Sequence, residues 1–127
     1  MPHKILIVDD ASFVREILKT ISLKQGWTVI GEASDGEEAV EMSKRLIPDY
    51  IIMDIVMPKI NGLEAGKLIL KNNPLISIIG LSTIDQEEIL LKAIDIGFIS
   101  YITKPFENRT VIRAVNEAIQ MKARKSG

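Results

Sequence analysis

The chain has 127 residues, a formal net charge of −1, no cysteine, and 46% hydrophobic residues. This length fits a single domain, residues 1–127, that buries its own core. The lack of cysteine excludes a disulfide framework and a thiolate metal site, and a charge near zero argues against nucleic acid as the direct partner. The sequence contains no signal peptide and no apolar run of ~20 residues, so we expect a cytoplasmic protein that does not contact a membrane.

Ten segments alternate between two hydrophobic patterns along the chain. Short runs rich in β-branched residues predict strands at residues 4–8, 28–32, 50–53, 76–81 and 101–103. The second run is more polar than the others, which predicts a strand at an edge of the sheet. Helical spacing of apolar residues predicts helices at residues 14–21, 39–46, 89–94 and 111–119, and a weaker pattern at 63–70 fills the remaining gap.

The alternation of strand and helix predicts an α/β fold. Right-handed crossovers between successive strands give a doubly wound, five-stranded parallel sheet with helices on both faces. Asp35 followed by Glu38 predicts a capping box, and Gly26 and Gly97 stand where helices would end in a left-handed residue.

Polar residues stand where four of the predicted strands end, and they are Asp9, Asp10, Asp54, Ser82 and Lys104. Each residue taken alone is more often a helix cap, a turn residue or a solvated charge. In an open parallel sheet, however, ligands bind beyond the carboxyl ends of the strands, where the strand order reverses. We therefore expect these five side chains to share one functional site.

The residue types in this set indicate metal-dependent phosphoryl chemistry. Three carboxylates would repel each other by roughly 3–4 kcal/mol per pair at separations of about 4–5 Å, and a divalent cation would offset that repulsion. Oxygen ligands without histidine or cysteine suit Mg²⁺. Asp54 ends its strand and is the candidate nucleophile for an acyl phosphate. Lys104 and Ser82 would supply the fixed cation and the hydroxyl donor that phosphoryl transfer needs.

Four sequence blocks carry a resemblance to a known family. They are Ile-Val-Asp-Asp-Ala at 7–11, Met-Asp-Ile-Val-Met-Pro at 53–58 with Gly62, Leu-Ser at 81–82, and Tyr-Ile-Thr-Lys-Pro-Phe at 101–106. Over essentially its whole length the chain resembles the receiver domains of two-component response regulators, and among them the stand-alone chemotaxis receivers. The resemblance implies a flavodoxin-like fold with five helices and strand order 2-1-3-4-5. It also implies a cis peptide bond between Lys104 and Pro105.

The resemblance assigns the acceptor and the metal ligands. Asp54 would accept a phosphoryl group from a phosphohistidine of a sensor histidine kinase. Mg²⁺ would be held by Asp9, Asp10 and Asp54, with the backbone carbonyl of Val56 as a further ligand.

The resemblance also implies how the signal leaves the site. Ser82 would hydrogen-bond the phosphoryl group, Lys104 would pair with it, and Tyr101 would be the aromatic switch residue that turns inward in response. Such a protein is a phospho-acceptor switch that catalyses only its own phosphorylation and dephosphorylation. Its output would pass to a downstream protein such as the flagellar motor switch, and a phosphatase would be a further partner.

Three residues depart from the family pattern. Val56 and Ile84, each two residues beyond a site residue, are apolar where the family often carries polar or acidic groups. Apolar side chains there should hinder the attacking water, which predicts slow self-dephosphorylation. Thr83 stands where the family usually has a small residue, and its bulk is expected to crowd the phosphoryl pocket.

Other functions stay open at this point. A phosphorelay intermediate, or the receiver domain of a larger response regulator, would carry the same residues. A pseudo-receiver that binds partners without phosphorylation usually lacks a site residue, and none is missing here. A haloacid dehalogenase would need an Asp where Val56 stands, and the sequence has no glycine-rich nucleotide loop.

Overall fold

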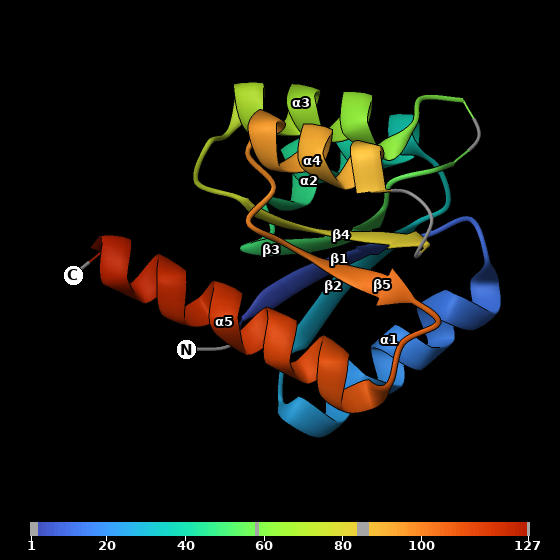
Figure 1. Ribbon diagram of the computed structural model, residues 1–127. Helices are drawn as coiled ribbons and strands as arrows, with labels where there is room; N and C mark the ends of the chain where they lie inside the picture. Colours follow the sequence, from blue (N-terminus) through green and yellow to red (C-terminus); the bar gives the residue numbers. More distant parts are fainter. Residues whose placement is uncertain (1–2, 58, 84–86, 127) are drawn as a thin grey trace.

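The computed structural model describes residues 3–57, 59–83 and 87–126. Within them, five parallel strands form one sheet in the order β2-β1-β3-β4-β5 (Figure 1). The strands are β1 (Lys4–Val8), β2 (Thr28–Ala33), β3 (Tyr50–Asp54), β4 (Ser77–Thr83) and β5 (Ser100–Lys104). The helices are α1 (Ser12–Gln25), α2 (Gly36–Leu46), α3 (Gly62–Asn72), α4 (Glu87–Ile96) and α5 (Asn108–Ser126). The predicted fold class and strand order are confirmed, and the polar strand β2 does lie at an edge.

Helices cover both faces of the sheet. Figure 1 shows α1 and α5 on one face and α2, α3 and α4 on the other. Successive side chains along a strand point to opposite faces, so the sheet separates two apolar cores. Ile7 and Ile52 pack in the core on the α1 and α5 side, whereas Val8 and Met53 pack in the other. Every residue of β3 is buried, so this strand is central and its last residue, Asp54, lies at the carboxyl edge between the two layers.

The helix ends follow the predicted signals. The Asp35 carboxylate accepts a hydrogen bond from the Glu38 backbone N–H over 2.8 Å, and the Glu38 carboxylate accepts one from the Ser34 N–H over 3.0 Å. The capping box is therefore present, with its return bond one residue before the cap. Gly26 and Gly97 have φ angles of 80° and 121°, so each takes the positive φ that glycine tolerates best.

Four strands end later than their hydrophobic runs predict, and three of them, β3, β4 and β5, continue through a polar residue of the predicted site. Backbone pairing continues through the polar residues at the strand ends, because Asp54 pairs with Leu81 and Thr83 pairs with Lys104. Asp54, Ser82 and Lys104 therefore belong to β3, β4 and β5 rather than to the loops that follow. Their backbones are fixed by the sheet, which makes this edge a rigid platform for side chains.

The loop after β3 folds back tightly against the strand end. The Gly62 N–H donates a hydrogen bond to the Ile55 carbonyl over 2.6 Å. A Cβ atom at Gly62 would collide with the backbone of Asp54 and Ile55, so only glycine fits this close approach. The Lys104–Pro105 peptide bond is cis, as expected.

Candidate functional site

Three carboxylates meet at the carboxyl edge of β1 and β3. Asp9, Asp10 and Asp54 each offer one oxygen, and these oxygens lie within 4.8 Å of one another. Since β1 and β3 are neighbours, with Val8 paired to Met53, the residues that follow this pair are brought side by side. Asp9 and Asp54 are buried, whereas Asp10 is exposed. All three donors are hard carboxylate oxygens, so the cluster has the chemistry that Mg²⁺ prefers.

Lys104 connects two of these carboxylates across the sheet. Its ammonium lies 2.7 Å from Asp9 Oδ2 and 3.1 Å from Asp54 Oδ2, with one hydrogen bond to each. Burial would lower the pKa of Lys104, but the hydrogen bond to Asp9 and the charges of both carboxylates outweigh it and raise the pKa overall. Lys104 is therefore firmly charged where it faces Asp54.

The surroundings of Asp54 disfavour the ionised form of its carboxyl group, in contrast to a carboxyl group at the surface. Burial raises its pKa, the positive charge of Lys104 lowers it, and the negative charge of Asp9 raises it again, with a net upward shift. Its Oδ1 accepts a hydrogen bond from the Val56 N–H over 3.2 Å. In the metal-free site, the charge of Lys104 therefore does not fully offset the effects of burial and of Asp9 on the Asp54 carboxylate.

Asp9 is held from several directions. Its Oδ1 accepts a hydrogen bond from the Ala11 N–H over 2.9 Å, and its own N–H donates to the Ala33 carbonyl over 3.1 Å. The Arg15 guanidinium donates to the Asp9 carbonyl over 2.7 Å and also binds Glu32. Sequence reasoning did not identify Arg15 or Glu32. Arg15 stands near the start of α1, where the helix dipole disfavours a cation. This unfavourable position was the one sequence feature that could have indicated a specific binding partner for the Arg15 side chain.

Ser82 contributes a buried hydroxyl. The side chain lies near the end of β4 with 1% exposure, and its Oγ has no hydrogen-bond partner among the described residues. Leu81, directly before it, pairs with Asp54, so the hydroxyl belongs to the same edge of the sheet. A buried hydroxyl without a partner costs about 1–3 kcal/mol, which favours a site that a ligand completes.

The remaining residues singled out from the sequence lie around this edge. The Val56 side chain is 49% exposed and the Tyr101 side chain 47% exposed. Thr83 is exposed at the end of β4. Ile84 lies outside the described residues, so the prediction about its apolar side chain is not assessed.

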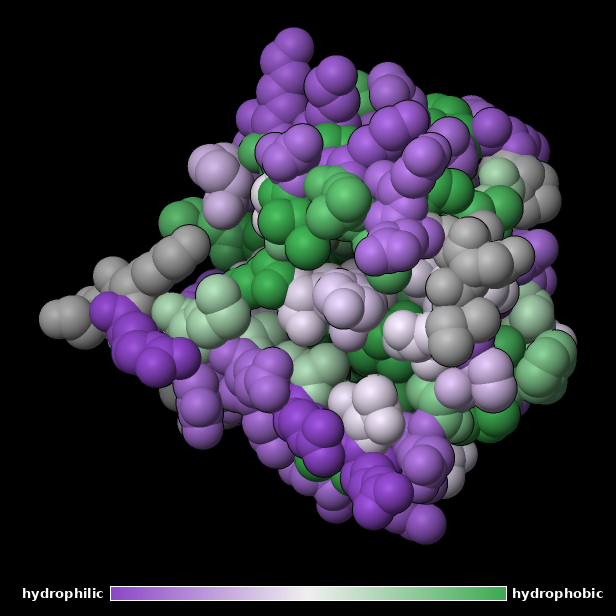
Figure 2. All heavy atoms as spheres, in the orientation of Figure 1, coloured by the Kyte–Doolittle hydropathy of each residue, from purple (hydrophilic) through white to green (hydrophobic). Residues whose placement is uncertain are grey.

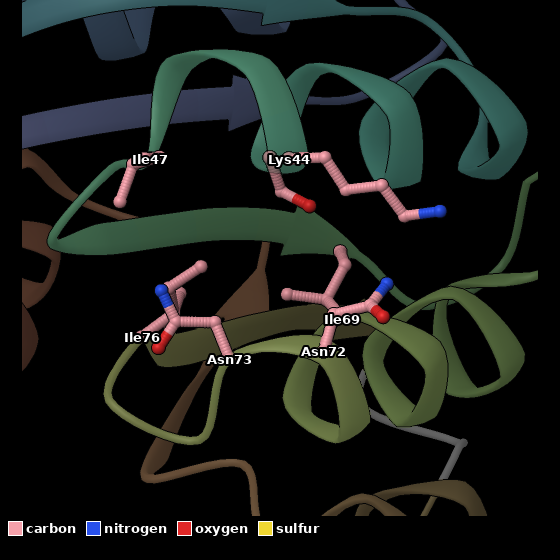
Figure 3. A pocket seen from close by; sticks show the side chains of 7 residues that line it. Lys44, Ile47, Ile69, Asn72, Asn73 and Ile76 are labelled. Atoms are coloured by element: carbon pink, nitrogen blue, oxygen red, sulfur yellow. The ribbon is translucent and has the colours of Figure 1, made fainter.

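The described residues also form several pockets, and an apolar one of them borders Lys104. An apolar groove of about 360 Å³ runs between α1 and the segment after β5, where Phe13 and Ile17 face Pro105 and Phe106, and it was not anticipated. A second pocket, drawn in Figure 3, lies between the C-terminal ends of α2 and α3, beside Ile47 and Ile76. Because both of these residues precede strands, the second pocket is at the opposite end of the sheet from Asp54.

Comparison with known proteins identifies the family and the fold. The family model described as "Response regulator receiver domain" matches residues 5–116. The chain is a response regulator receiver domain. The receiver is 45% identical to the chemotaxis protein CheY of Thermotoga maritima over 92% of this chain and 98% of that one. It is 40% identical to the CheY of Bacillus subtilis over 94% of this chain and 99% of that one.

A solved structure supports the same assignment. The crystal structure of the CheX-CheY-BeF₃-Mg²⁺ complex from Borrelia burgdorferi includes a chain with 30% sequence identity and a TM-score of 0.89 to this receiver. The match covers 94% of the receiver and 90% of that chain. Receiver domains are regulatory and bind Mg²⁺ in an acidic pocket, and the three clustered carboxylates fit such a pocket. Searched over its described residues, the receiver has no helix that is long and apolar enough to cross a membrane.

Proposed function

We propose that this receiver accepts a phosphoryl group on Asp54 from a sensor histidine kinase and then changes its affinity for a partner protein. The observation that carries the proposal is the joint placement of Asp54, Lys104 and Ser82 at the ends of β3, β5 and β4. A carboxylate nucleophile, a fixed cation and a hydroxyl donor are the groups that phosphoryl transfer needs.

The transfer step needs little beyond positioning. An Asp54 carboxylate oxygen attacks the phosphorus of the phosphohistidine, forming a P–O bond while the N–P bond breaks. The electron pair of the broken bond stays on the imidazole nitrogen. Lys104, already 3.1 Å from Asp54 Oδ2, would pair with the transferred phosphoryl oxygens. The Ser82 hydroxyl, which has no partner among the described residues, would donate to one of them.

The metal ligands would be the carboxylates of Asp9, Asp10 and Asp54 and the backbone carbonyl of Val56. Bound Mg²⁺ supplies positive charge that neutralises the phosphoryl oxygens. The buried Asp9 carboxylate is already oriented by Lys104 and the Ala11 N–H, so part of this ligand set exists before metal binds.

The output surface would be the face formed by α4, β5 and α5. Figure 2 shows apolar and weakly polar side chains on this face, bordered by hydrophilic side chains along α5. Leu91, Ile94 and Tyr101 are its exposed large apolar residues on α4 and β5. Two added charges at Asp54 would draw Ser82 toward the phosphoryl group and allow Tyr101 to turn inward, which changes the shape that a partner reads.

Chemotaxis is the pathway we propose, with the flagellar motor switch as the downstream partner and a phosphatase as a further one. The similarity to two CheY proteins over nearly their whole lengths supports this choice. A phosphorelay intermediate, or a receiver domain that serves a larger regulator, would use the same residues and is the second candidate.

Phosphorylation by acetyl phosphate, followed by intact-mass spectrometry with and without Mg²⁺, tests the proposal. We expect the wild type to gain one phosphoryl group in the presence of Mg²⁺, and Asp54→Asn to gain none. Asp95→Asn, the same substitution at an exposed position on α4, is the matched control and should behave as the wild type.

Absence of uptake by the folded wild type would overturn the proposal and favour a pseudo-receiver that binds partners without phosphorylation. Uptake that persists in Asp54→Asn would show that another residue is the acceptor. Circular dichroism of each variant establishes that the protein is folded.

A further inference from the structure

The Arg15 side chain joins an edge strand to the metal-site loop. Its Nε donates to Glu32 Oε1 over 3.0 Å, and its Nη1 donates to the Asp9 carbonyl over 2.7 Å. Glu32 lies on β2, paired with Ile7 on β1, so its backbone is fixed by the sheet. The planar guanidinium therefore links a rigid carboxylate to the last carbonyl before Asp10.

Glu32 is itself held from a second side. Lys19 lies 2.9 Å from Glu32 Oε2 and 2.6 Å from Glu16. The pKa of Glu32 is lowered, first by the hydrogen bond from Lys19 and then by that from Arg15, against the opposing effect of burial. Glu32 is thus a charged anchor for Arg15. Lys19 shares this anchor, but none of its hydrogen bonds or ion pairs involves Asp9.

The two neighbouring carboxylates differ in what holds them. Asp9 is fixed through its side chain by Lys104 and by the Ala11 N–H. The Asp10 carboxylate, in contrast, is exposed and has no hydrogen bond or ion pair to any described residue. Its direction therefore depends on the backbone that carries it.

The peptide plane between Asp9 and Asp10 controls that direction. A peptide unit is planar, so fixing the Asp9 carbonyl also fixes the orientation of the Asp10 N–Cα bond. Arg15 holds this carbonyl with a charge-assisted hydrogen bond, which is stronger than a neutral one. We propose that Arg15 is a positioning residue of the Mg²⁺ site, aiming the Asp10 carboxylate at the metal by fixing the peptide between Asp9 and Asp10. The inference rests on the proposed function, in which this cluster binds Mg²⁺.

The direction in which Mg²⁺ affinity changes when Arg15 is replaced distinguishes a positioning role from a purely electrostatic effect of its charge. A cation near a metal site repels the metal, so removing the charge of Arg15 would by itself strengthen Mg²⁺ binding. Positioning predicts the opposite result. Loss of an outer-shell contact typically weakens metal affinity by 10–100-fold. We expect about 10-fold, because the carboxylates of Asp9 and Asp54 are held by Lys104 and by backbone N–H groups and not by Arg15.

Isothermal titration of the full chain with MgCl₂ measures the effect directly. We expect Arg15→Gln to raise the Mg²⁺ dissociation constant about 10-fold. Lys19→Gln removes the cation that pairs with the same Glu32 carboxylate, and Lys19 makes no hydrogen bond or ion pair with Asp9. This variant should bind Mg²⁺ as the wild type does or slightly more tightly. Arg15→Lys keeps the charge but loses the planar fork, so its affinity should lie between those of the wild type and Arg15→Gln.

The phosphorylation rate at increasing Mg²⁺ supplies a second measurement. For Arg15→Gln, the Mg²⁺ concentration at half-maximal rate should rise about 10-fold while the maximal rate stays within about twofold of wild type. A purely structural role would lower the stability to urea without shifting the Mg²⁺ dependence. If Arg15→Gln does not fold, Arg15→Lys decides, because weaker Mg²⁺ binding at unchanged charge supports positioning and unchanged binding overturns it.

The remaining outcomes distinguish this inference from the proposed function. A wild type that binds no Mg²⁺ overturns both. A wild type that binds Mg²⁺, together with an Arg15→Gln variant that binds it equally well or more tightly, overturns the positioning role alone.

Discussion

Lys104 lies closer to Asp9 than to Asp54, at 2.7 Å against 3.1 Å from the nearest carboxylate oxygen. The fixed cation of the site is therefore held mainly by a carboxylate that is not the proposed acceptor. Asp54 keeps a raised pKa even with Lys104 beside it, because burial and the charge of Asp9 act against ionisation. This imbalance makes the metal-free protein sensitive to pH and to substitutions in the cluster.

The Asp54→Asn variant should change how stability depends on pH in the absence of Mg²⁺. The folded state raises the pKa of Asp54 above its ordinary value of 3.8, so it binds the proton more tightly than the unfolded state. The contribution of Asp54 to stability is therefore present below 3.8 and is lost as the pH rises through the folded-state pKa. We expect urea unfolding with EDTA to find Asp54→Asn more stable than wild type by about 1 kcal/mol at pH 7, with the difference shrinking toward pH 4.

The exposed Asp95→Asn variant controls for loss of charge alone and should not show this pH-dependent difference. A difference between Asp54→Asn and wild type that grew as the pH fell would contradict the assignment of a raised pKa to Asp54.

Val56 should set the lifetime of the phosphorylated state. Its side chain is 49% exposed next to Asp54 and offers no polar group to orient a water molecule. We expect slow self-dephosphorylation in the wild type and a rate at least about tenfold higher in Val56→Asn, since a positioned polar group assists proton transfer. The decay of the phosphorylated mass after removal of the phosphodonor measures both rates. Leu23→Asn, at a residue 80% exposed near the end of α1, is the matched control and should leave the rate unchanged. A wild-type lifetime of only seconds without a phosphatase would show the prediction to be wrong.

Tyr101 should become less accessible when the site is activated. The chain has two tyrosines, and Tyr50 is only 2% exposed with a pKa raised by burial and then by Asp49, so nitration by tetranitromethane reports mainly on Tyr101. We expect nitration of Tyr101 to slow several-fold when beryllium fluoride and Mg²⁺ are added, because the phosphorylated-like state favours the inward position. Peptide mass mapping assigns the modified residue, and Asp54→Asn should show no response. Equal nitration rates in both states of the wild type would exclude Tyr101 as the switch.

Gly62 should be needed for the geometry of the acceptor site as well as for stability. A Cβ there would collide with the backbone of Asp54 and Ile55, so Gly62→Ala should cost roughly 1–3 kcal/mol and slow phosphorylation by acetyl phosphate. Gly26→Ala is a matched control, because Gly26 has φ 80° with no atom near its Cβ position and should cost about 1–2 kcal/mol through backbone strain alone. Urea unfolding and phosphorylation rates are compared for both variants. Similar rates in the two variants would mean that the Gly62 contact does not shape the site.

Most of the fold followed from local patterns. The strand β1 has the predicted bounds, and the Asp35 cap and the glycine at the end of α1 lie where predicted. The strand ends were predicted too short because a hydrophobic pattern stops at the first polar residue, whereas backbone pairing does not. Asp54 and Lys104 are polar and yet complete the ladders of β3 and β5.

The contacts of Arg15 could not be predicted from local patterns. Glu32 is 17 residues from Arg15, and the approach of the two side chains depends on the register between β1 and β2, which shifts between Ile5 and Leu6. Apart from the position of Arg15 near the start of α1, nothing in the sequence distinguishes either residue from an ordinary solvated charge. The apolar groove beside Phe13 was missed for a similar reason, since it is formed by residues of α1 together with the distant segment at Pro105 and Phe106.

The unpaired hydroxyl of Ser82 has a consequence for protein engineering. An alanine at this buried position would remove a polar atom that no described residue satisfies, at the loss of very little volume. A search for heat-resistant variants that scores folding alone would therefore select Ser82→Ala, and with it Asp54→Asn, which removes the carboxylate with the raised pKa. Such a variant would unfold at a higher temperature and would no longer transmit a signal. Thermostability screens of this chain therefore need phosphoryl uptake as a second criterion.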